Sequence, residues 1–83
     1  MLTIKILGHG CQNCQKLEKV TRQAVTDLHI EANVVKVSED ADIFAYPILS
    51  TPGLVINEKL VCAGRIPNAG EVARWVKESL AVN

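Results

Sequence analysis

The feature that most restricts the fold of this chain is a change of hydrophobic period at residues 8–10. Leu2–Leu7 has a short apolar and β-branched pattern that predicts a strand. From residue 12 to about residue 29, apolar residues recur at the spacing of a helix. Gly8-His9-Gly10 lies between the two patterns as a flexible turn. Cys11 and Cys14 fall at this junction, so the chain should begin with a strand that leads directly into a helix carrying both thiols.

The middle of the chain predicts a second strand and a short helix. Ala32–Val37 carries three valines and is expected to form a largely buried strand. Ser38 can cap the helix that follows, and the acidic residues after it favour the positive end of a helix dipole. This helix should end near Tyr46, because Pro47 disfavours helical backbone in the residue before it. The apolar residues expected to face the core are Ile43 and Phe44.

The last third of the chain predicts a hairpin and a closing helix. Gly53–Ile56 and residues 60–63 have the pattern of two short strands joined by Asn57-Glu58-Lys59. Asn68, followed three residues later by Glu71, resembles the capping box that begins a helix. The apolar stripe of this helix consists of Val72, Trp75, Val76, Ser79 and Leu80.

These elements follow the order β-α-β-α-β-β-α along residues 1–83, which we expect to form a single domain of the α/β class. The first strand, helix and strand should make a parallel, right-handed crossover, and the hairpin should add an antiparallel pair. A four-stranded mixed sheet flanked by helices is the arrangement that buries these apolar faces.

Charge and cysteine content narrow the class of function. The chain has 9 basic and 9 acidic residues, which argues against nucleic acid as a partner because phosphate binding needs a basic surplus. No basic amphipathic or transmembrane-length stretch suggests a membrane, and the first residues are too short for a secretory leader, so the cytoplasm is expected. Three cysteines do not suit a structural disulfide framework. In a reducing compartment a close cysteine pair is more often redox-active or metal-binding.

The position of the cysteine pair suggests a role for each thiol. Two cysteines three residues apart at a helix start can form a disulfide without unwinding the helix. The helix N-terminus presents unpaired N–H groups and partial positive charge, which stabilise a thiolate. Cys11, beside the glycine turn, would then attack a disulfide. Cys14, one turn along on the apolar face with Leu17, would resolve the mixed disulfide.

Two other interpretations of the pair stay open. Both cysteines could be core residues that share a helix face by chance. They could also bind a soft metal ion such as zinc or copper, since small metal-handling modules likewise carry a CxxC after their first strand. Copper-chaperone domains run β-α-β-β-α-β and end on a strand. This chain is predicted to end on a helix, which favours redox chemistry.

His9 and Cys62 are further candidates outside the pair. As an imidazolium, His9 could favour the thiolate or act as a local acid, although a histidine in an exposed turn is more often only solvated. Cys62 is predicted to lie in the last strand as a buried, inert residue. The alternative is a third thiol near the pair, or a zinc site made by Cys11, Cys14, Cys62 and His9.

Three motifs run in order along the chain: Gly8-x-Gly10-Cys11-x-x-Cys14-x-x-Leu17-Glu18, Ser50-Thr51-Pro52-Gly53-Leu54-Val55-Ile56 and Ala63-Gly64-Arg65-Ile66-Pro67. Together they resemble the small redox-active disulfide proteins of prokaryotes, short members of the thioredoxin/glutaredoxin family. The resemblance covers essentially the whole chain. It implies a thioredoxin-like fold and thiol-disulfide exchange with a disulfide-bearing protein substrate and a reductase that it does not identify.

The resemblance also implies roles for particular residues. In thioredoxin-like proteins the proline before the third strand is cis and lies beside the cysteine pair, and Thr51-Pro52 matches that position. The backbone of Thr51 would pair with an extended substrate strand; without the resemblance, Pro52 is an ordinary loop proline. His9 and Gly10 are candidate modulators of the pair. We expect a monomer that needs neither a metal nor a dissociable cofactor.

The chain departs from ordinary thioredoxins in two respects. Gly8-His9-Gly10 replaces their tryptophan-bearing segment, so the usual aromatic docking surface is missing. No match to their buried acidic residue is evident either. Use of ordinary thioredoxin reductase is therefore not implied.

Overall fold

The computed structural model describes residues 2–48 and 50–81, and it contains the expected elements in the expected order. They are β1 (Leu2–Leu7), α1 (Gln12–Asp27), β2 (Ala32–Val37), α2 (Asp40–Ile43), β3 (Gly53–Ile56), β4 (Lys59–Ala63) and α3 (Ala69–Ala81). The α/β class and the element order are therefore confirmed.

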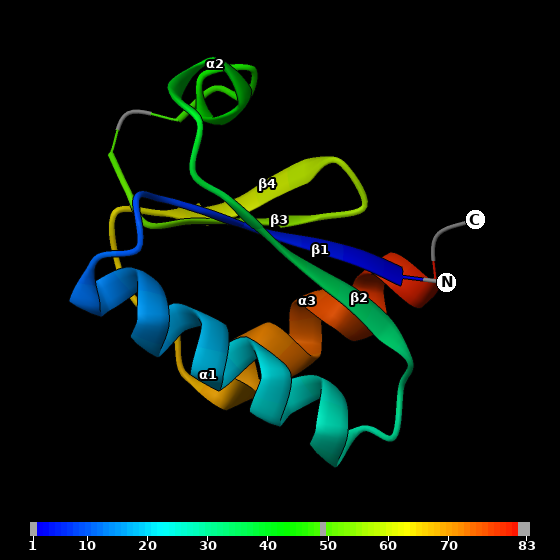
Figure 1. Cartoon of the computed structure of the whole chain (residues 1–83). Helices are drawn as coiled ribbons and strands as arrows, with labels where there is room; N and C mark the ends of the chain where they lie inside the picture. The colour runs from blue at the N-terminus through cyan, green and yellow to red at the C-terminus, as the bar shows by residue number, and fades with distance from the viewer. Residues whose placement is uncertain (1, 49, 82–83) are drawn as a thin grey trace.

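The four strands form one mixed sheet in the order β2-β1-β3-β4. β1 pairs in parallel with β2 and antiparallel with β3, and β3 pairs antiparallel with β4. Ile4 of the central strand β1 consequently lies opposite Val34 on one side and Ile56 on the other. Helices α1 and α3 lie on one face of the sheet and α2 on the other (Figure 1). The loop after β1, which leads to the cysteine pair at the start of α1, therefore leaves from the middle of the sheet.

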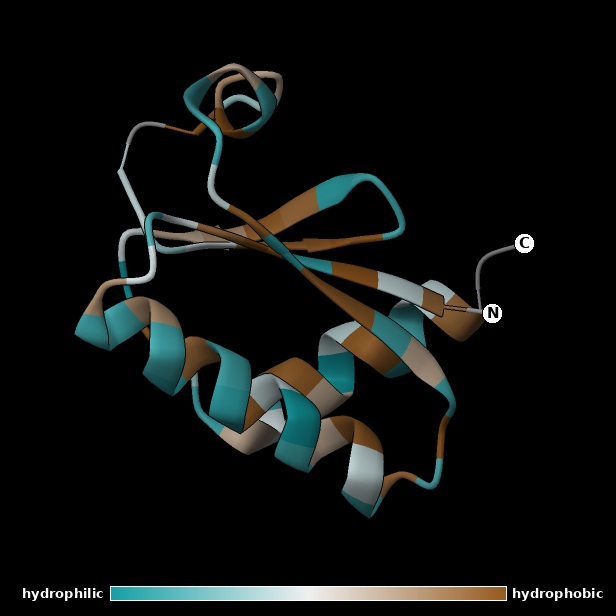
Figure 2. Cartoon of the chain, in the orientation of Figure 1, coloured by the Kyte–Doolittle hydropathy of each residue, from teal (hydrophilic) through white to brown (hydrophobic). Residues whose placement is uncertain are grey.

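The main hydrophobic core lies between the sheet and helices α1 and α3. The helices turn their apolar stripes toward the strands and their polar faces toward solvent (Figure 2). Because side chains alternate along a strand, every second residue of β1 enters this core. Its fully or nearly fully buried side chains include Leu2, Ile4, Ile6, Leu17, Val25, Leu54, Ile56, Val72 and Val76.

The opposite sheet face is covered only in part. Leu7, Ile43, Ile48 and Val55 form a second, smaller buried cluster. Beside it, the Lys5 ammonium donates hydrogen bonds to the Tyr46 hydroxyl at 2.9 Å and to the Glu58 carboxylate at 2.8 Å. The Tyr46 hydroxyl in turn donates to Glu58 at 3.0 Å. These contacts raise the pKa of Lys5 and lower that of Glu58, so both groups stay charged where the sheet is open to solvent.

The structure corrects the expected burial of β2. Instead of being largely buried, this strand is at the edge of the sheet and its residues are half-buried or exposed. Val35 is 36% exposed. An edge strand has a neighbour on one side only, and α2 does not extend over this part of the sheet (Figure 1).

The expectations for the second helix are also corrected in three details. Its N-cap is Glu39, with no side-chain hydrogen bond, so Ser38 is not the cap. The helix ends at Ile43, before Tyr46. Ile43 is fully buried, but Phe44 is 67% exposed. A helix of one turn directs only a narrow side toward the sheet, and Ile43 takes that position.

The hairpin turn is shorter than expected. Lys59 already belongs to β4 and pairs with Ile56, so the turn consists of Asn57 and Glu58. Both have positive φ, 49° and 70°, as a two-residue type I′ turn requires. Asparagine accepts this conformation readily, and the turn forms without glycine.

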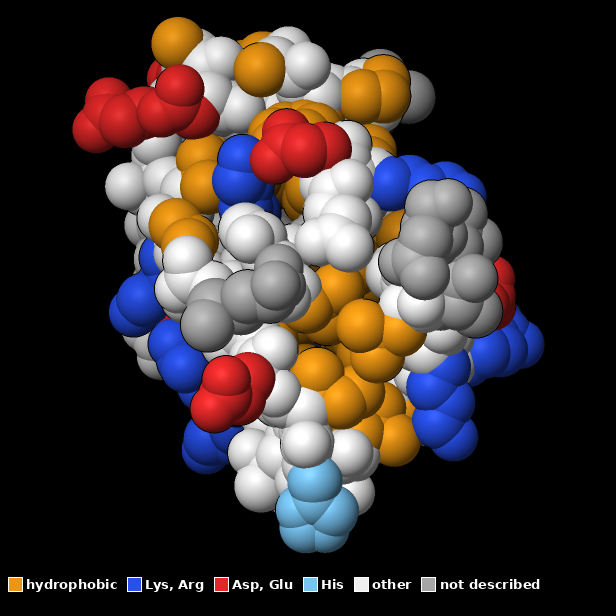
Figure 3. Space-filling model, turned by 90° about the vertical axis from the view of Figure 1, so that its right-hand side faces the viewer, with side chains coloured by type: hydrophobic (Ala, Val, Ile, Leu, Met, Phe, Trp, Pro, Cys, Tyr) orange, Lys and Arg blue, Asp and Glu red, His pale blue; other side chains and the backbone are white. Residues whose placement is uncertain are grey.

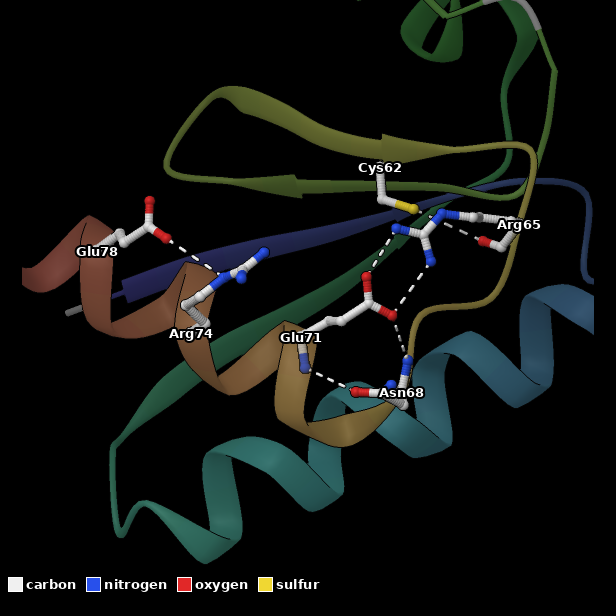
Figure 4. A network of polar contacts seen from close by, with 6 residues as sticks. All are labelled: Cys62, Arg65, Asn68, Glu71, Arg74 and Glu78. Atoms are coloured by element: carbon white, nitrogen blue, oxygen red, sulfur yellow. Dashed lines mark hydrogen bonds and ion pairs between the residues drawn. The ribbon is translucent and has the colours of Figure 1, made fainter.

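The capping box at the start of α3 is confirmed. The Glu71 N–H donates to Asn68 Oδ1 at 2.8 Å, and Glu71 Oε1 accepts from the Asn68 N–H at 3.2 Å. The Arg65 guanidinium adds two hydrogen bonds to the same carboxylate, at 3.2 and 2.8 Å (Figure 4). Arg65 first, and the Asn68 backbone second, lower the pKa of Glu71.

We expect Glu71→Gln to reduce stability at neutral pH and to have little effect in acid. Because the folded-state pKa of Glu71 lies below its ordinary value of 4.5, its contribution is complete above that value and is lost as pH falls through the folded pKa. Glutamine can keep the hydrogen bond to the Asn68 N–H, so the substitution removes the charge and one of the two Arg65 hydrogen bonds while the capping box remains. Urea unfolding at pH 7 and in acid measures the difference. Equal differences at both pH values would contradict an ionic contribution.

Candidate redox site

A tight loop joins β1 to α1 and positions the cysteine pair. Gly8 continues the pairing between β1 and β2, because its N–H donates to the Val37 carbonyl at 2.9 Å. Gly10 has φ +76°, a left-handed conformation that suits glycine, and there the chain turns into the helix. The Gln15 side chain donates to the Gly10 carbonyl at 3.3 Å. Sheet and helix thus hold the loop at both ends.

Cys11 and Cys14 are joined by a disulfide, and their Cα atoms are 5.0 Å apart. Cys11 is the N-cap of α1, and its sulfur accepts a hydrogen bond from the Cys14 N–H at 3.2 Å. The first turn of α1 has no acidic residue, so no negative charge offsets the positive end of the helix dipole. Cys11 is exposed, whereas Cys14 is only 5% exposed. The two sulfurs therefore differ sharply in access.

The structure brings Thr51-Pro52 to the pair. The Thr51–Pro52 peptide bond is cis, Thr51 is exposed and Pro52 is buried. A Cβ atom built on Gly8 would overlap the Cys14 sulfur and lie 4.0 Å from Thr51 Cβ, so both residues border the space beside the Gly8 Cα. The Pro52 carbonyl accepts from the Gly64 N–H at 2.9 Å. Among the described residues, Thr51 makes no backbone hydrogen bond.

Gly8 is a site residue whose role the sequence did not reveal, because its importance is spatial. We expect Gly8→Ala to destabilise the oxidised protein by roughly 1–3 kcal/mol, since the new methyl group would overlap the buried Cys14 sulfur. Urea unfolding of the oxidised form measures this. Gly10→Asn is the matched control: asparagine tolerates positive φ, and a Cβ there meets no atom within 4 Å. A Gly8→Ala protein as stable as wild type would contradict the steric argument.

A cavity of about 370 Å³ reaches Cys14 from the side of β2. Its charged and titratable lining residues are His9 from the loop, Glu18 from α1 and Lys36 from β2. Glu18 binds Arg22 at 3.0 Å and Lys36 at 3.5 Å, and the Arg22 hydrogen bond is the main cause that lowers its pKa. Another cavity, of about 480 Å³, lies between the hairpin and α3 and has no cysteine in its lining.

The His9 ring forms a hydrogen bond with a residue from a distant part of the chain. Its Nε2 lies 2.6 Å from Asp40 Oδ1, which ties the cysteine loop to the first turn of α2. Both side chains are exposed. The partner Asp40 was not evident from the sequence, because 31 residues separate it from His9 and only the fold brings them together.

Cys62 does not join the pair. It is buried in β4, and its sulfur donates to the Arg65 carbonyl at 3.8 Å (Figure 4). Within residues 2–48 and 50–81, no three or more His, Cys, Asp or Glu side chains gather as metal ligands. The four-residue site with Cys11, Cys14, Cys62 and His9 is therefore not assembled, and the expected burial of Cys62 is confirmed.

Residues 2–77 match the family model described as "Thioredoxin domain". The chain is 38% identical over 74 residues to a protein named thioredoxin from Methanothermobacter thermautotrophicus, covering 89% of this chain and 96% of that protein. It is 32% identical over 80 residues to a thioredoxin from Methanocaldococcus jannaschii, covering 96% of this chain and 92% of the other. This chain belongs to the thioredoxin family.

The solved structures agree with this assignment at the level of fold. Thioredoxin-2 of the malaria parasite superposes with a TM-score of 0.70 at 10% identity, over 94% of this chain and 82% of that one. As a member of the thioredoxin family with a CxxC pair, the protein is a thiol-disulfide oxidoreductase. In the part of the chain that the structure describes, no helix combines the length and apolar character needed to cross a bilayer.

Proposed function

We propose that this thioredoxin-family protein exchanges its Cys11–Cys14 dithiol with the disulfide of a partner protein. The observation that carries the proposal is the unequal exposure of two linked sulfurs at one helix start: Cys11 is open to solvent and Cys14 is 5% exposed. Only Cys11 can meet a disulfide on another protein. Cys14 can attack only the Cys11 sulfur of the same molecule.

The exchange takes two steps. The Cys11 thiolate attacks one sulfur of the partner disulfide, and the other partner sulfur leaves. Cys14 then attacks Cys11 Sγ, which breaks the mixed disulfide and releases the second partner sulfur. The pair ends oxidised and the partner ends as two thiols. The positive end of α1, with no acidic residue in its first turn, stabilises the Cys11 thiolate.

Thr51 and Pro52 would hold the partner. A proline has no N–H to donate, so pairing with an extended substrate segment would use the backbone of the exposed Thr51, as in strand addition. Thr51 and Cys14 both border the space beside the Gly8 Cα, which supports placing the substrate strand along this side of the pair. His9 and Gly10 shape the loop on the other side of the pair.

The cellular setting is part of the same proposal. We expect residues 1–83 to act as a single domain and a monomer in the cytoplasm, where a reductase returns the pair to the dithiol. The equal numbers of acidic and basic residues make nucleic acid an unsuitable partner.

The experiment is a thiol titration across dithiothreitol redox buffers without metal, with mass spectrometry of alkylated cysteines. We expect a reversible two-electron transition confined to Cys11 and Cys14, at a potential between roughly −180 and −300 mV. Cys62 is the internal control, because it should be alkylated only after unfolding. A pair that stays reduced throughout, or protein purified with stoichiometric metal on the pair, would contradict the proposal and favour soft-metal binding.

A further inference from the structure

The proposed exchange requires an acceptor for the proton of Cys14. The thiolate is the nucleophile in disulfide exchange, so Cys14 must lose its proton when it resolves the mixed disulfide. Its side chain is only 5% exposed. The cavity of about 370 Å³ lies against this residue, and it is roomy enough to hold water. The groups that line this cavity are therefore the candidates to receive the proton.

Glu18 is the weaker of the two candidate acceptors. It lies one helical turn after Cys14 and lines the cavity. Its carboxylate, however, is bound by Arg22 at 3.0 Å and by Lys36 at 3.5 Å. These contacts stabilise the ionised form and lower the pKa of Glu18. A carboxylate held in this way has little affinity for a thiol proton.

His9 has the arrangement of an oriented base. Its Nε2 is 2.6 Å from Asp40 Oδ1, and an ionised carboxylate can only accept, so Nε2 carries the hydrogen. In the neutral ring, Nδ1 is then the acceptor. Asp40 from α2 binds the His9 ring, and the charged residues that line the same cavity as His9 are Glu18 from α1 and Lys36 from β2.

We propose that His9, oriented by Asp40, receives the Cys14 proton through the cavity during resolution of the mixed disulfide. As the proton moves to His9 Nδ1, Cys14 Sγ bonds to Cys11 Sγ, and the bond between Cys11 Sγ and the partner sulfur breaks. The partner leaves as a thiolate and takes the proton back from the imidazolium. The pair has then lost two electrons and two protons, and the partner disulfide has gained both. His9 is thus a catalytic base, and Asp40 is its positioning residue.

The test uses dithiobis(nitrobenzoate), an aromatic disulfide that releases a coloured thiolate at each step. Reduced protein carrying Cys62→Ala is mixed with one equivalent of reagent, so only the pair reacts. Attack by Cys11 releases the first thiolate, and attack by Cys14 releases the second. This leaving group needs no proton, so the second phase reports proton removal from Cys14. Its rate is measured from about pH 5.5 to 8.5, the range in which histidine changes charge.

We expect His9→Gln to slow the second phase by about tenfold near neutral pH and to remove the inflection caused by histidine. Asp40→Ala should slow it less, because the ring remains but loses the hydrogen bond that orients it. The first phase should stay within about twofold of wild type in both variants. Glu18→Gln is the matched control for the rival acceptor and should leave the second phase unchanged.

A second phase with the wild-type rate and pH profile in His9→Gln would overturn the proposal. A slowed first phase with a normal second phase in His9→Gln would also overturn it, because His9 would then act in the activation of Cys11. Loss of the second phase in Glu18→Gln alone would overturn it too, because Glu18 would then be the acceptor. This inference rests on the proposed exchange, and the same assay separates their failures. If the wild-type protein releases no second thiolate, it is the exchange itself that fails. Thermal unfolding of each variant verifies its fold.

Discussion

Cys11→Ser is expected to abolish disulfide reduction, with a loss of the order of 10³-fold or more, the size typical of removing a nucleophile in covalent catalysis. Serine has the shape of cysteine, and its hydroxyl oxygen can replace the Cys11 sulfur as the N-cap acceptor of α1, so the helix and the fold should be retained. What disappears is the exposed sulfur at the positive end of the helix. The measurement is reduction of a synthetic peptide cyclised by one disulfide, with dithiothreitol as the electron source and chromatography as the readout.

Cys14→Ser is expected to trap the mixed disulfide between Cys11 and the peptide. Cys11 can still attack, but no buried thiol follows to break the mixed disulfide. We therefore expect a covalent adduct between Cys11 and the peptide, detected by mass spectrometry and reversed by excess reductant. Cys62→Ala serves as the control and should keep wild-type turnover, since Cys62 is buried away from the pair. Failure of Cys14→Ser to trap the peptide, or residual turnover by Cys11→Ser near wild type, would reject the assigned roles.

Leu54→Ala should have the largest effect on stability, about 2.7–5 kcal/mol. Leu54 is fully buried in β3, where it lies opposite Ile6 of β1 and Cys62 of β4. Neighbouring strands on both sides restrain the backbone, so the cavity cannot close by a small shift. A chain of this length typically has roughly 4–12 kcal/mol of total stability, so this loss would leave a marginally folded protein.

Urea unfolding of the oxidised protein, followed by fluorescence of Trp75, the single tryptophan, measures the Leu54 effect. The midpoint should fall, while the dependence on urea should stay constant if both states expose similar surface. Leu80→Ala is the matched control, because Leu80 is 46% exposed and loses little on truncation. A Leu54→Ala protein within about 1 kcal/mol of wild type would mean that the core repacks around the missing side chain.

The second sheet face and the end of the molecule remote from the cysteines are less completely covered. Figure 3 views the end of the molecule where β1 begins and α3 ends, and hydrophobic side chains gather there in a strip between separated charged groups. The cavity between the hairpin and α3, with half-buried Trp75 in its lining, accounts for further exposed apolar surface. We assign no role to either.

Local patterns along the sequence determined the elements and the position of the redox pair. The change of period at residues 8–10 placed Cys11 and Cys14 at a strand-to-helix junction, as the structure has them. The capping box of Asn68 and Glu71 could likewise be predicted from the sequence, because its partners are three residues apart and interact within one helical turn. Features set by contacts between near neighbours can be predicted from sequence.

Only the tertiary structure decided which surfaces are covered and which distant residues meet. The valines of β2 suggested burial, yet the sheet order makes β2 an edge strand. Phe44 is as apolar as Ile43, but one turn of helix can bury only one of them. The approach of Thr51 to Gly8 and of His9 to Asp40 depends on how loops from different parts of the chain converge. Such long-range contacts leave no periodic pattern in the sequence, because packing across the sheet creates them, and local backbone preference does not.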